Sequence, residues 1–536
     1  MITEHRNLDT AYDTVVLGSG ASGLVAAVRA ARGGRRVLVL EKDERLGGTS
    51  AVGGGVMWVP GNHLMSEGGW HDTREGAAAY LHAATDGYMD AEWIDWYLDT
   101  APRAVRFLTE EAGIRLRALG RPDYHQHLPG AASGGRGLDN DPFDPGPYEG
   151  LVELVRPPTY LPPISMAERD ALQGEPVDPG LLEQRRRDGL RTMGGALVGR
   201  LLVAAAEAGV HVANRARVTG LERTDGGDWQ VESAAGTFTA PDVVLASGGF
   251  EWNPRLRAAF LAFPVTPISA PSNEGDGLEL GMGAGASLDL VRAVWGVPVI
   301  TPPDARYDGR PSGRMGNVEM TLPGSVTVNA AGRRFVNEAV NYHDANRVFG
   351  NVEPGTGKLA NQPAWLVMDH EYLRRYSVAG SVPGRVEDWM TTADTPRGLA
   401  EACGIDPAGL EATLERFNAD ARAGVDTEFG RGGSPQDRHL GDPDNTPNPC
   451  LRPVEHGPFH AVPISAGVLG TAGGLAVDTR GRVLGADGHP LEGLHAAGNV
   501  SASVFRDAYP GGGATLGSAV TRGFAVGEHL ASRARV

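Results

Sequence analysis

The sequence has very few cysteines, with only Cys403 and Cys450 among its 536 residues. A disulfide framework and a cysteine-based metal site are therefore not expected, and the chain suits a reducing cytoplasm. No run of about 18 apolar residues occurs, so no membrane-spanning helix is predicted. Residues 1–10 are polar and contain no apolar core, so no signal peptide is expected.

An excess of positive charge is also absent. The chain carries 49 Lys and Arg against 66 Asp and Glu, a formal net charge of -17. Nucleic-acid binding is not expected, because it requires a basic footprint. Glycine and proline are abundant: 76 glycines and 37 prolines indicate many turns and close contacts between backbone and ligand.

The N-terminal 30 or so residues predict a nucleotide site. Residues 12–17 read as a buried strand, 24–31 as a helix rich in small residues, and 36–40 as a second strand. The segment 18–23 between the first two has the pattern G-x-G-x-x-G, and Glu41 follows the second strand. In this order, the motif predicts a dinucleotide-binding fold.

Each residue of that motif has an expected task. Gly18 permits the tight turn, Gly20 lets the pyrophosphate approach, and Gly23 allows close packing of helix on strand. Glu41 is expected to accept hydrogen bonds from the ribose hydroxyls. The bare N–H groups where the helix begins favour negative charge.

A second glycine-rich stretch distinguishes the cofactor. Residues 46–55 continue the glycine-rich surface, whereas a nicotinamide domain usually enters its next βαβ unit here. This loop resembles the flavin-proximal segment of the fumarate reductase/succinate dehydrogenase flavoprotein superfamily. Thr49 or Ser50 is expected to hydrogen-bond the pyrophosphate or the flavin ring. No histidine lies between Gly47 and Gly61, so the resemblance implies non-covalent FAD.

The rest of the chain divides into segments that differ in how often glycine turns occur. Glycine turns recur up to about residue 289, fade between 290 and 465, and return afterwards. We therefore predict an FAD-binding domain in two parts, 10–289 and 466–534, with an inserted α+β catalytic domain at 290–465. The fold class is α/β, α+β overall, with a Rossmann-like FAD-binding domain. Residues 325–338 predict a β-hairpin.

The C-terminal stretch 507–517 combines a tyrosine hydroxyl, small residues with bare N–H groups and a predicted helix start. Together with the segment 497–499, it is where we expect cofactor and substrate to meet. The full set of predicted cofactor-binding residues is Gly18, Gly20, Ala21, Ser22, Gly23, Glu41, Lys42, Gly48, Thr49, Ser50, Gly54, Gly55, Val218, Ala246, Ser247, Gly248, Asp276, Gly498, Asn499, Ala514, Thr515 and Leu516.

Over nearly its whole length, the sequence resembles the 3-ketosteroid Δ1-dehydrogenases. The resemblance rests on the nucleotide motif and on further motifs spread along the chain: Gly47–Ser50, Gly249–Asn253, Gly275–Gly277, Val328–Ala339, Pro363–Trp365, Pro447–Pro449, Gly470–Gly474, Ala497–Asn499 and Tyr509–Gly517. It implies that a hydride leaves C1 of a 3-ketosteroid for flavin N5 while a proton leaves C2.

The resemblance also implies the catalytic residues. Tyr509 and the backbone N–H of Gly513 would donate hydrogen bonds to the C3 carbonyl oxygen. Tyr342 would be the base at C2, and Tyr124 would assist it. An unperturbed tyrosine has a pKa near 10, so a base of this type needs a neighbouring hydroxyl or a favourable field.

Three positions depart from the family pattern. Asn341 and Gly512 stand where proline is common, and Arg522 places a charge in the helix that follows the flavin loop. Because of Gly512 and Arg522, a substrate that is a different ketone stays open as an alternative. His125 and His127 have the spacing of a metal pair, but no further ligand is near in sequence, so no metal site is predicted.

Three other functions remain open. One is a 3-ketosteroid Δ4-(5α)-dehydrogenase or an enzyme for another cyclic ketone. Another is a soluble fumarate reductase, although the segment 467–471 lacks the histidine that this chemistry needs. The third is a flavin-bearing electron-transfer subunit. The predicted partners are a hydrophobic ketone, a steroid by resemblance, and an unidentified electron acceptor.

Overall fold

The computed structural model describes residues 5–172 and 177–533. Residues 1–4, where part of the signal-peptide prediction falls, and 534, the end of the last predicted segment, lie outside the described residues. The chain forms two compact units. Unit 1 comprises Met1–Leu261, Ser269–Val294 and Gly470–Val536, and unit 2 comprises Ala262–Ile268 and Trp295–Leu469. Residues 262–268, placed by the sequence in the first part, belong to unit 2 because β11 (Thr266–Pro267) pairs with β20 (Phe459–Thr471).

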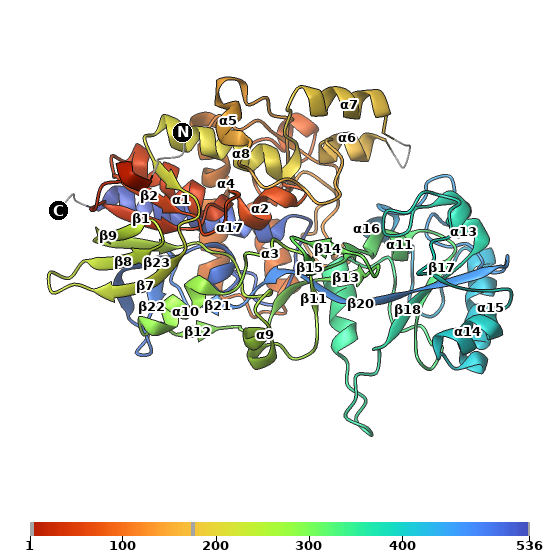
Figure 1. Ribbon diagram of the computed structural model, residues 1–536. Helices are drawn as coiled ribbons and strands as arrows, with labels where there is room; N and C mark the ends of the chain where they lie inside the picture. The colour runs from red at the N-terminus through yellow and green to blue at the C-terminus, as the bar shows by residue number, and fades with distance from the viewer. Residues whose placement is uncertain (1–4, 173–176, 534–536) are drawn as a thin grey trace. The chain divides into compact units, whose positions relative to one another are not determined.

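A mainly parallel sheet organises unit 1 (Figure 1). Its strand order is β22-β23-β10-β1-β2-β6, and only the β22–β23 pairing is antiparallel. The bounds are β1 Thr14–Leu17, β2 Val37–Leu40, β6 His211–Ala213, β10 Asp242–Leu245, β22 Arg482–Leu484 and β23 Pro490–Ala496. Runs such as Val-Leu-Val-Leu in β2 are buried throughout, as parallel strands covered on both faces require.

Two helices from opposite ends of the chain pack together in unit 1. They are α1 (Ala21–Arg32) and α17 (Ala514–Ser532), and α8 (Met193–Glu207) also packs on α1. Glycines permit the close crossing of α1 and α17. A Cβ on Gly523 would lie 2.3 Å from the carbonyl oxygen of Ser22, and one on Gly527 would lie 2.7 Å from that of Ala26.

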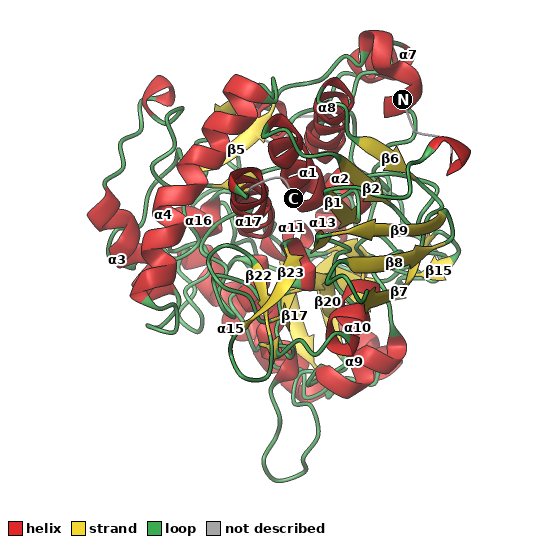
Figure 2. Ribbon diagram, turned by 90° about the vertical axis from the view of Figure 1, so that its left-hand side faces the viewer, coloured by secondary structure: helices red, strands yellow, loops and turns green. Residues whose placement is uncertain are grey.

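Smaller elements complete unit 1. Figure 2 shows β7, β8 and β9 side by side, and these form an antiparallel sheet. The other sheets are β3–β5–β4 and β12–β21. The bounds are β3 Met57–Trp58, β4 Leu116–Ala118, β5 Gly137–Asn140, β7 Val218–Arg223, β8 Trp229–Ser233, β9 Gly236–Ala240, β12 Leu288–Asp289, β21 Gly474–Leu475, α2 Gly48–Val52, α3 Arg74–Ala84, α4 Ala91–Arg106, α5 Glu149–Val152, α6 Met166–Ala171, α7 Pro179–Arg187, α9 Pro254–Phe260 and α10 Asp276–Gly283.

Unit 2 is built on a second sheet of order β16-β13-β20-β18-β17, with β11 and β19 paired to β20. Its strands alternate between two apolar clusters, with Leu366 and Met368 on one face and Val367 on the other. Among the residues that cover the second face, Phe417 is 1% exposed, which contributes about 1.5–3 kcal/mol. The bounds are β13 Val294–Ile300, β14 Arg306–Tyr307, β15 Arg310–Pro311, β16 Arg314–Met315, β17 Ser325–Asn329, β18 Ala364–Asp369, β19 Thr391–Ala393, α11 Asn317–Thr321, α12 Tyr342–Arg347, α13 His370–Arg375, α14 Pro396–Cys403, α15 Pro407–Ala423 and α16 Pro435–Arg438.

The hairpin predicted for residues 325–338 does not form. β17 pairs instead with β18, and only a single bridge joins Val328 to Arg334. The second arm is not a strand because its charged side chains, Arg334 and Glu338, turn inward and are engaged in buried ion pairs.

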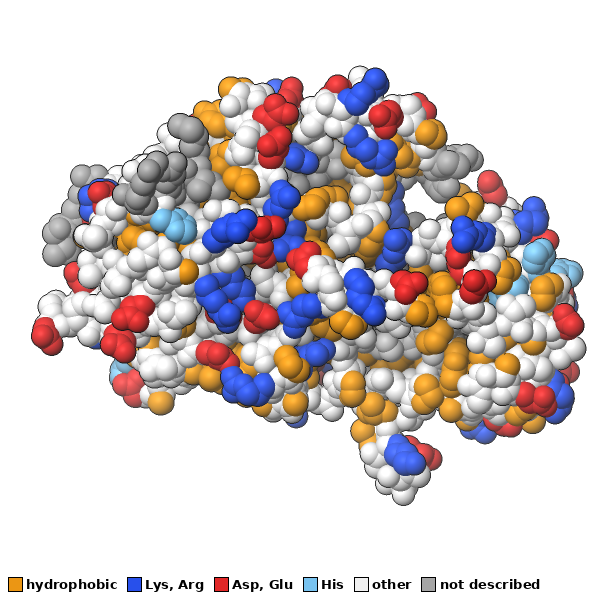
Figure 3. Space-filling view, viewed as in Figure 1, with side chains coloured by type: hydrophobic (Ala, Val, Ile, Leu, Met, Phe, Trp, Pro, Cys, Tyr) orange, Lys and Arg blue, Asp and Glu red, His pale blue; other side chains and the backbone are white. Residues whose placement is uncertain are grey.

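Within the described ranges, no helix is both long and apolar enough to cross a membrane. Across the face drawn in Figure 3, acidic and basic side chains are interspersed. The net negative charge is therefore not gathered into one acidic patch on that face.

Candidate active site

Three glycine-containing segments meet at one edge of the unit 1 sheet. They are 18–23, 246–248 and 497–499, which follow the carboxyl ends of the neighbouring strands β1, β10 and β23. This edge of an open α/β sheet is where ligands bind. The segments touch: a Cβ on Gly18 would lie 2.4 Å from the Ala246 carbonyl oxygen, and one on Gly498 would lie 2.5 Å from Ser22 Oγ.

The glycine motif leaves room for a dinucleotide. Gly18 has a φ of 107°, and a Cβ on Gly23 would lie 2.3 Å from the Gly18 carbonyl oxygen, so packing demands both glycines. Gly20 is different, because a Cβ there would meet only Ser50 Oγ, at 3.6 Å. Its open face precedes the first turn of α1, which suits the approach of a pyrophosphate.

Glu41 lies at the end of β2 and is 7% exposed. Its Oε2 accepts hydrogen bonds from the Ser19 N–H at 3.0 Å and the Ser19 hydroxyl at 2.6 Å, and its Oε1 accepts from the Asp43 N–H at 3.0 Å. Carboxylate oxygens accept several hydrogen bonds each. The carboxylate is therefore held at the strand end and keeps acceptor capacity for ribose hydroxyls.

Lys42 and Asp276, both predicted to bind the cofactor, pair with each other. The ammonium of Lys42 lies 3.1 Å from Asp276 Oδ1 and 3.0 Å from Glu274 Oε2. Arg217 adds a second cation 3.0 Å from Asp276. This ion-pair group ties the loop after β2 to the start of α10.

The loop predicted to face the flavin begins α2. Ser50 Oγ accepts a hydrogen bond from the Ala21 N–H at 3.1 Å, which joins α2 to the start of α1. Thr49 Oγ1 accepts from the Ala270 N–H at 3.1 Å and from Asn273 Nδ2 at 2.8 Å. The same Asn273 amide donates to Glu251 Oε1 at 2.8 Å.

Glu251 is a buried carboxyl behind this loop that the sequence did not single out. It is 0% exposed, and Ser269 Oγ also donates to it, at 2.6 Å. Burial raises the pKa of Glu251 above its ordinary value. The acidic residue in the Gly-Gly-Phe-Glu motif was the available signal, because a charged residue next to buried apolar residues needs a partner.

The other predicted cofactor residues differ in the room around them. Gly48 has a φ of 50° with open space at its Cβ position, whereas Gly54, Gly55 and Gly248 are closely packed. Val218 is buried at the start of β7, and Ser247 Oγ accepts from the Gly277 N–H at 3.1 Å. Asn499 lies in a short turn after β23, and Ala514, Thr515 and Leu516 form the first turn of α17.

Three of the four predicted catalytic residues come together in unit 1. The rings of Tyr124 and Tyr509 are stacked, with centroids 5.7 Å apart and planes 20° apart. The Tyr124 N–H donates to the Pro510 carbonyl at 3.1 Å, and the Thr515 hydroxyl donates to Tyr509 Oη at 3.2 Å. Gly513 has a φ of 97° and precedes α17. In the part of the chain that is described, no residue accepts a hydrogen bond from the Gly513 N–H.

The fourth, Tyr342, lies in unit 2 as the first residue of α12. Asn341 caps this helix by accepting a hydrogen bond from the Asp344 N–H at 3.0 Å. The φ of Asn341 is −51°, which lies inside the range that a proline ring imposes. The departure from the family's proline therefore leaves the backbone in a proline-compatible conformation.

Two further features that the sequence singled out are Arg522 and the pair His125 and His127. Arg522 is buried in α17 and donates to Ser501 Oγ at 2.8 Å and to the Ala502 carbonyl at 2.6 Å. Burial lowers its pKa to about 10. The rings of His125 and His127 lie 6.2 Å apart. Over residues 5–172 and 177–533, no group of three or more His, Cys, Asp or Glu side chains is arranged to hold a metal.

Comparisons with known proteins agree with this arrangement. Residues 13–516 match the family described as FAD binding domain. The chain is 40% identical to 4-oxocyclohexanecarboxylate 2-dehydrogenase of Sinomonas cyclohexanicum, over 98% of this chain and 93% of that protein. It is 36% identical to 3-oxosteroid 1-dehydrogenase of Mycolicibacterium smegmatis, over 98% of each chain.

A solved structure is similar over the same length. The 3-ketosteroid Δ1-dehydrogenase of Sterolibacterium denitrificans, in complex with 1,4-androstadiene-3,17-dione, matches with a TM-score of 0.89 and 34% identity. The match covers 98% of this chain and 100% of that one. The glycine-lined strand edge, the acidic residue after β2 and these full-length matches agree: the chain belongs to the 3-ketosteroid Δ1-dehydrogenase family of FAD-dependent oxidoreductases.

Proposed function

We propose that the protein carries out the 1,2-dehydrogenation of a 3-ketosteroid. The observation that carries the proposal is that Tyr509 and Gly513 lie on one loop directly before α17, and that the Gly513 N–H donates to no residue that the structure describes. The helix α17 packs on the turn 498–500 at the glycine-lined edge of the unit 1 sheet. Two donors on one loop suit a carbonyl oxygen on which negative charge develops.

The chain's own residues then have defined tasks. Tyr509 and the Gly513 N–H donate hydrogen bonds to the C3 carbonyl oxygen and so acidify the hydrogens at C2. Tyr342 removes the C2 proton, and Tyr124 assists it. FAD, bound non-covalently, supplies the acceptor for the hydride from C1. We propose that unit 1 binds FAD and that unit 2 contributes the base.

A second candidate substrate is a monocyclic ketone that carries a carboxylate. The relative with 40% identity is named for 4-oxocyclohexanecarboxylate, and its alignment with this chain runs over 539 residues. The identity to the mycobacterial steroid enzyme is 36% over the same 98% of this chain. The higher identity to the cyclohexanecarboxylate enzyme, 40%, supports the smaller ketone as the second candidate.

The reaction delivers two electrons, so the enzyme needs an oxidant to turn over again. We propose a soluble or membrane-associated electron acceptor outside this chain. Both cysteines are free, and we propose that the enzyme works in the reducing cytoplasm.

The substitution Tyr509→Phe tests the carbonyl-donor role. Loss of one such donor typically lowers turnover by about 10²–10³, so we expect that loss with the FAD content unchanged. Tyr88→Phe, at a site that is 73% exposed, is the matched control. Turnover of 4-androstene-3,17-dione and of 4-oxocyclohexanecarboxylate is measured with an artificial electron acceptor. If Tyr509→Phe turned over like the control, the role would be wrong.

A further inference from the structure

We propose that Asp123, Arg136 and Trp58 form a positioning unit that holds Tyr124 and Gly513 in place beside Tyr509. The inference rests on the proposed function, because it concerns the geometry of the same catalytic groups. None of the three side chains was singled out by the sequence.

Asp123 is the centre of the positioning unit and is 2% exposed. Its Oδ1 accepts a hydrogen bond from the Trp58 indole N–H at 2.8 Å. Its Oδ2 accepts from the Ala132 N–H at 2.9 Å and from Arg136 Nη1 at 2.6 Å. Three donors thus fix the carboxylate, and the next residue along the chain is Tyr124.

Trp58 connects this carboxylate to the Tyr509 loop. Its backbone N–H donates to the Gly513 carbonyl at 3.1 Å. Its indole lies against Gly511, where a Cβ would be 2.4 Å from Trp58 Cδ1. The Trp58 carbonyl in turn accepts from the Tyr97 hydroxyl at 2.6 Å. The loop can therefore approach the indole only because Gly511 has no side chain.

Arg136 compensates the buried charge of Asp123. Its guanidinium also bonds both oxygens of Asp72, at 2.9 and 2.7 Å, and lies 5.8 Å from the Trp58 ring centroid and 5.4 Å from that of Tyr80. Tyr80 donates to the same Pro510 carbonyl that accepts from the Tyr124 N–H. These contacts thus connect the segment that carries Tyr124 to the loop that carries Tyr509.

This arrangement answers a geometric need. Tyr124 and Tyr509 lie on irregular segments far apart in sequence, so no shared helix or strand fixes the distance between them. A misplacement of about 1 Å can cost roughly 10²-fold in rate. The positioning unit supplies the rigidity that the two loops lack.

The test is Asp123→Asn in the FAD-loaded enzyme. The amide keeps an oxygen for the indole N–H but loses the charge that holds Arg136. We expect kcat for the ketone to fall by about 10- to 100-fold. The FAD content should stay at the wild-type level, as should the affinity for 1,4-androstadiene-3,17-dione, measured by the change in flavin absorbance. Asp141→Asn, which breaks the exposed Arg117–Asp141 pair nearby, is the control.

A kcat equal to that of the control would overturn the inference, and so would a loss of product affinity that matches the loss of kcat. Trp58→Phe, which removes the indole N–H that donates to Asp123 and reduces the ring beside Gly511, carries the same test if Asp123→Asn does not accumulate as folded protein. If the wild-type enzyme oxidises no cyclic ketone, the proposed function fails instead, so the two failures are distinguishable.

Discussion

At the scale of single residues, Glu41 is a carboxylate that its own neighbours hold in one orientation. Its carboxylate is held by Ser19 and by the Asp43 N–H at the end of a buried strand. The sequence predicted the position because strand, glycine motif, helix, strand and acid follow in fixed order. It could not predict Ser19, because that contact depends on the turn geometry of the folded loop.

Glu41→Ala should weaken FAD binding. A hydrogen bond to a charged group contributes about 1.5–3 kcal/mol, which corresponds to roughly 10- to 100-fold in Kd. The measurement is FAD titration of the apoenzyme. Glu44→Ala is the control, since Glu44 forms a surface pair with Arg215. An FAD affinity equal to that of the control would contradict the ribose role.

The predicted cofactor residues Lys42 and Asp276 illustrate a limit of sequence reasoning. Both lie beside the expected site, yet they are engaged with each other. Spacing along the chain indicates which residues come near a ligand, but not which neighbouring side chains form ion pairs with them. Trp58 and Arg136 were not predicted as site residues, because their hydrogen-bond partners are far away in the sequence.

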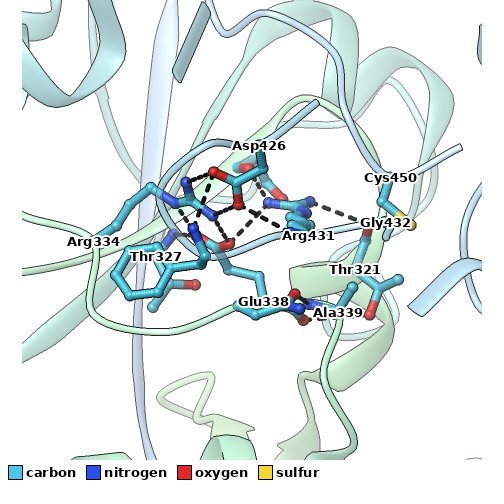
Figure 4. A network of polar contacts seen from close by, with 12 residues as sticks. Thr321, Thr327, Arg334, Glu338, Ala339, Asp426, Arg431, Gly432 and Cys450 are labelled. Carbon is cyan, nitrogen blue, oxygen red and sulfur yellow. Dashed lines mark hydrogen bonds and ion pairs between the residues drawn. The ribbon is translucent and has the colours of Figure 1, made fainter. Parts of the chain in front are cut away.

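At the scale of elements, unit 2 contains a buried ion cluster that replaced the predicted hairpin. Figure 4 shows Arg334 between Glu338 and Asp426, with Arg431 adjoining. Arg334 makes paired hydrogen bonds to both carboxylates, at 2.6–2.9 Å, and its side chain is 1% exposed. The alternating pattern of residues 325–338 favoured a hairpin, but tertiary charge pairing overrode it.

Arg334→Met should destabilise unit 2 strongly. Removal of Arg334 leaves two buried carboxylates with Arg431 as their neighbouring cation, 3.4 Å from Glu338, and loss of one partner of a buried ion pair typically costs about 3–5 kcal/mol. The measurement is the thermal unfolding midpoint. Arg374→Met, which removes an exposed partner of Glu371, should have a far smaller effect. Equal midpoints for the two variants would show that the cluster does not stabilise the fold.

The same cluster predicts acid sensitivity. Arg334 lowers the pKa of Asp426 to about 2 and also lowers the pKa of Glu338, against the desolvation that opposes both shifts. Folded pKa values below the unfolded ones mean that this stabilisation is present above about pH 4.5 and is lost as the pH falls toward about 2. Thermal midpoints measured across that range should fall for the wild type and change less for Arg334→Met. Parallel curves would refute this origin of acid sensitivity.

At the scale of the whole molecule, each of the two units has its own core. The positions of the first two nucleotide strands, 12–17 and 36–40, were predictable from the sequence, because glycine turns and buried runs mark strand ends. The position of the short segment 262–268 in unit 2 was not predictable, since its pairing with β20 joins residues 201 positions apart, such as Thr266 and Gly467.

FAD should therefore stabilise the two units unequally. A ligand at 100 times its Kd adds about 2.7 kcal/mol to the folded state that binds it. Hydrogen exchange should slow in β1, α1 and the first turn of α17 when FAD is added, and should change little in α15 of unit 2. Equal protection throughout, or protection confined to unit 2, would contradict the assignment of FAD to unit 1.

The central claim, that the enzyme removes one hydrogen from the α carbon and one from the β carbon of a cyclic ketone, is tested most directly by anaerobic mixing. The purified yellow enzyme is mixed with 4-androstene-3,17-dione or with 4-oxocyclohexanecarboxylate, the flavin absorbance is followed, and the product is identified. The account predicts bleaching of the flavin and a new double bond conjugated to the ketone, at C1–C2 in the steroid. A flavin that stays oxidised with both ketones would contradict it.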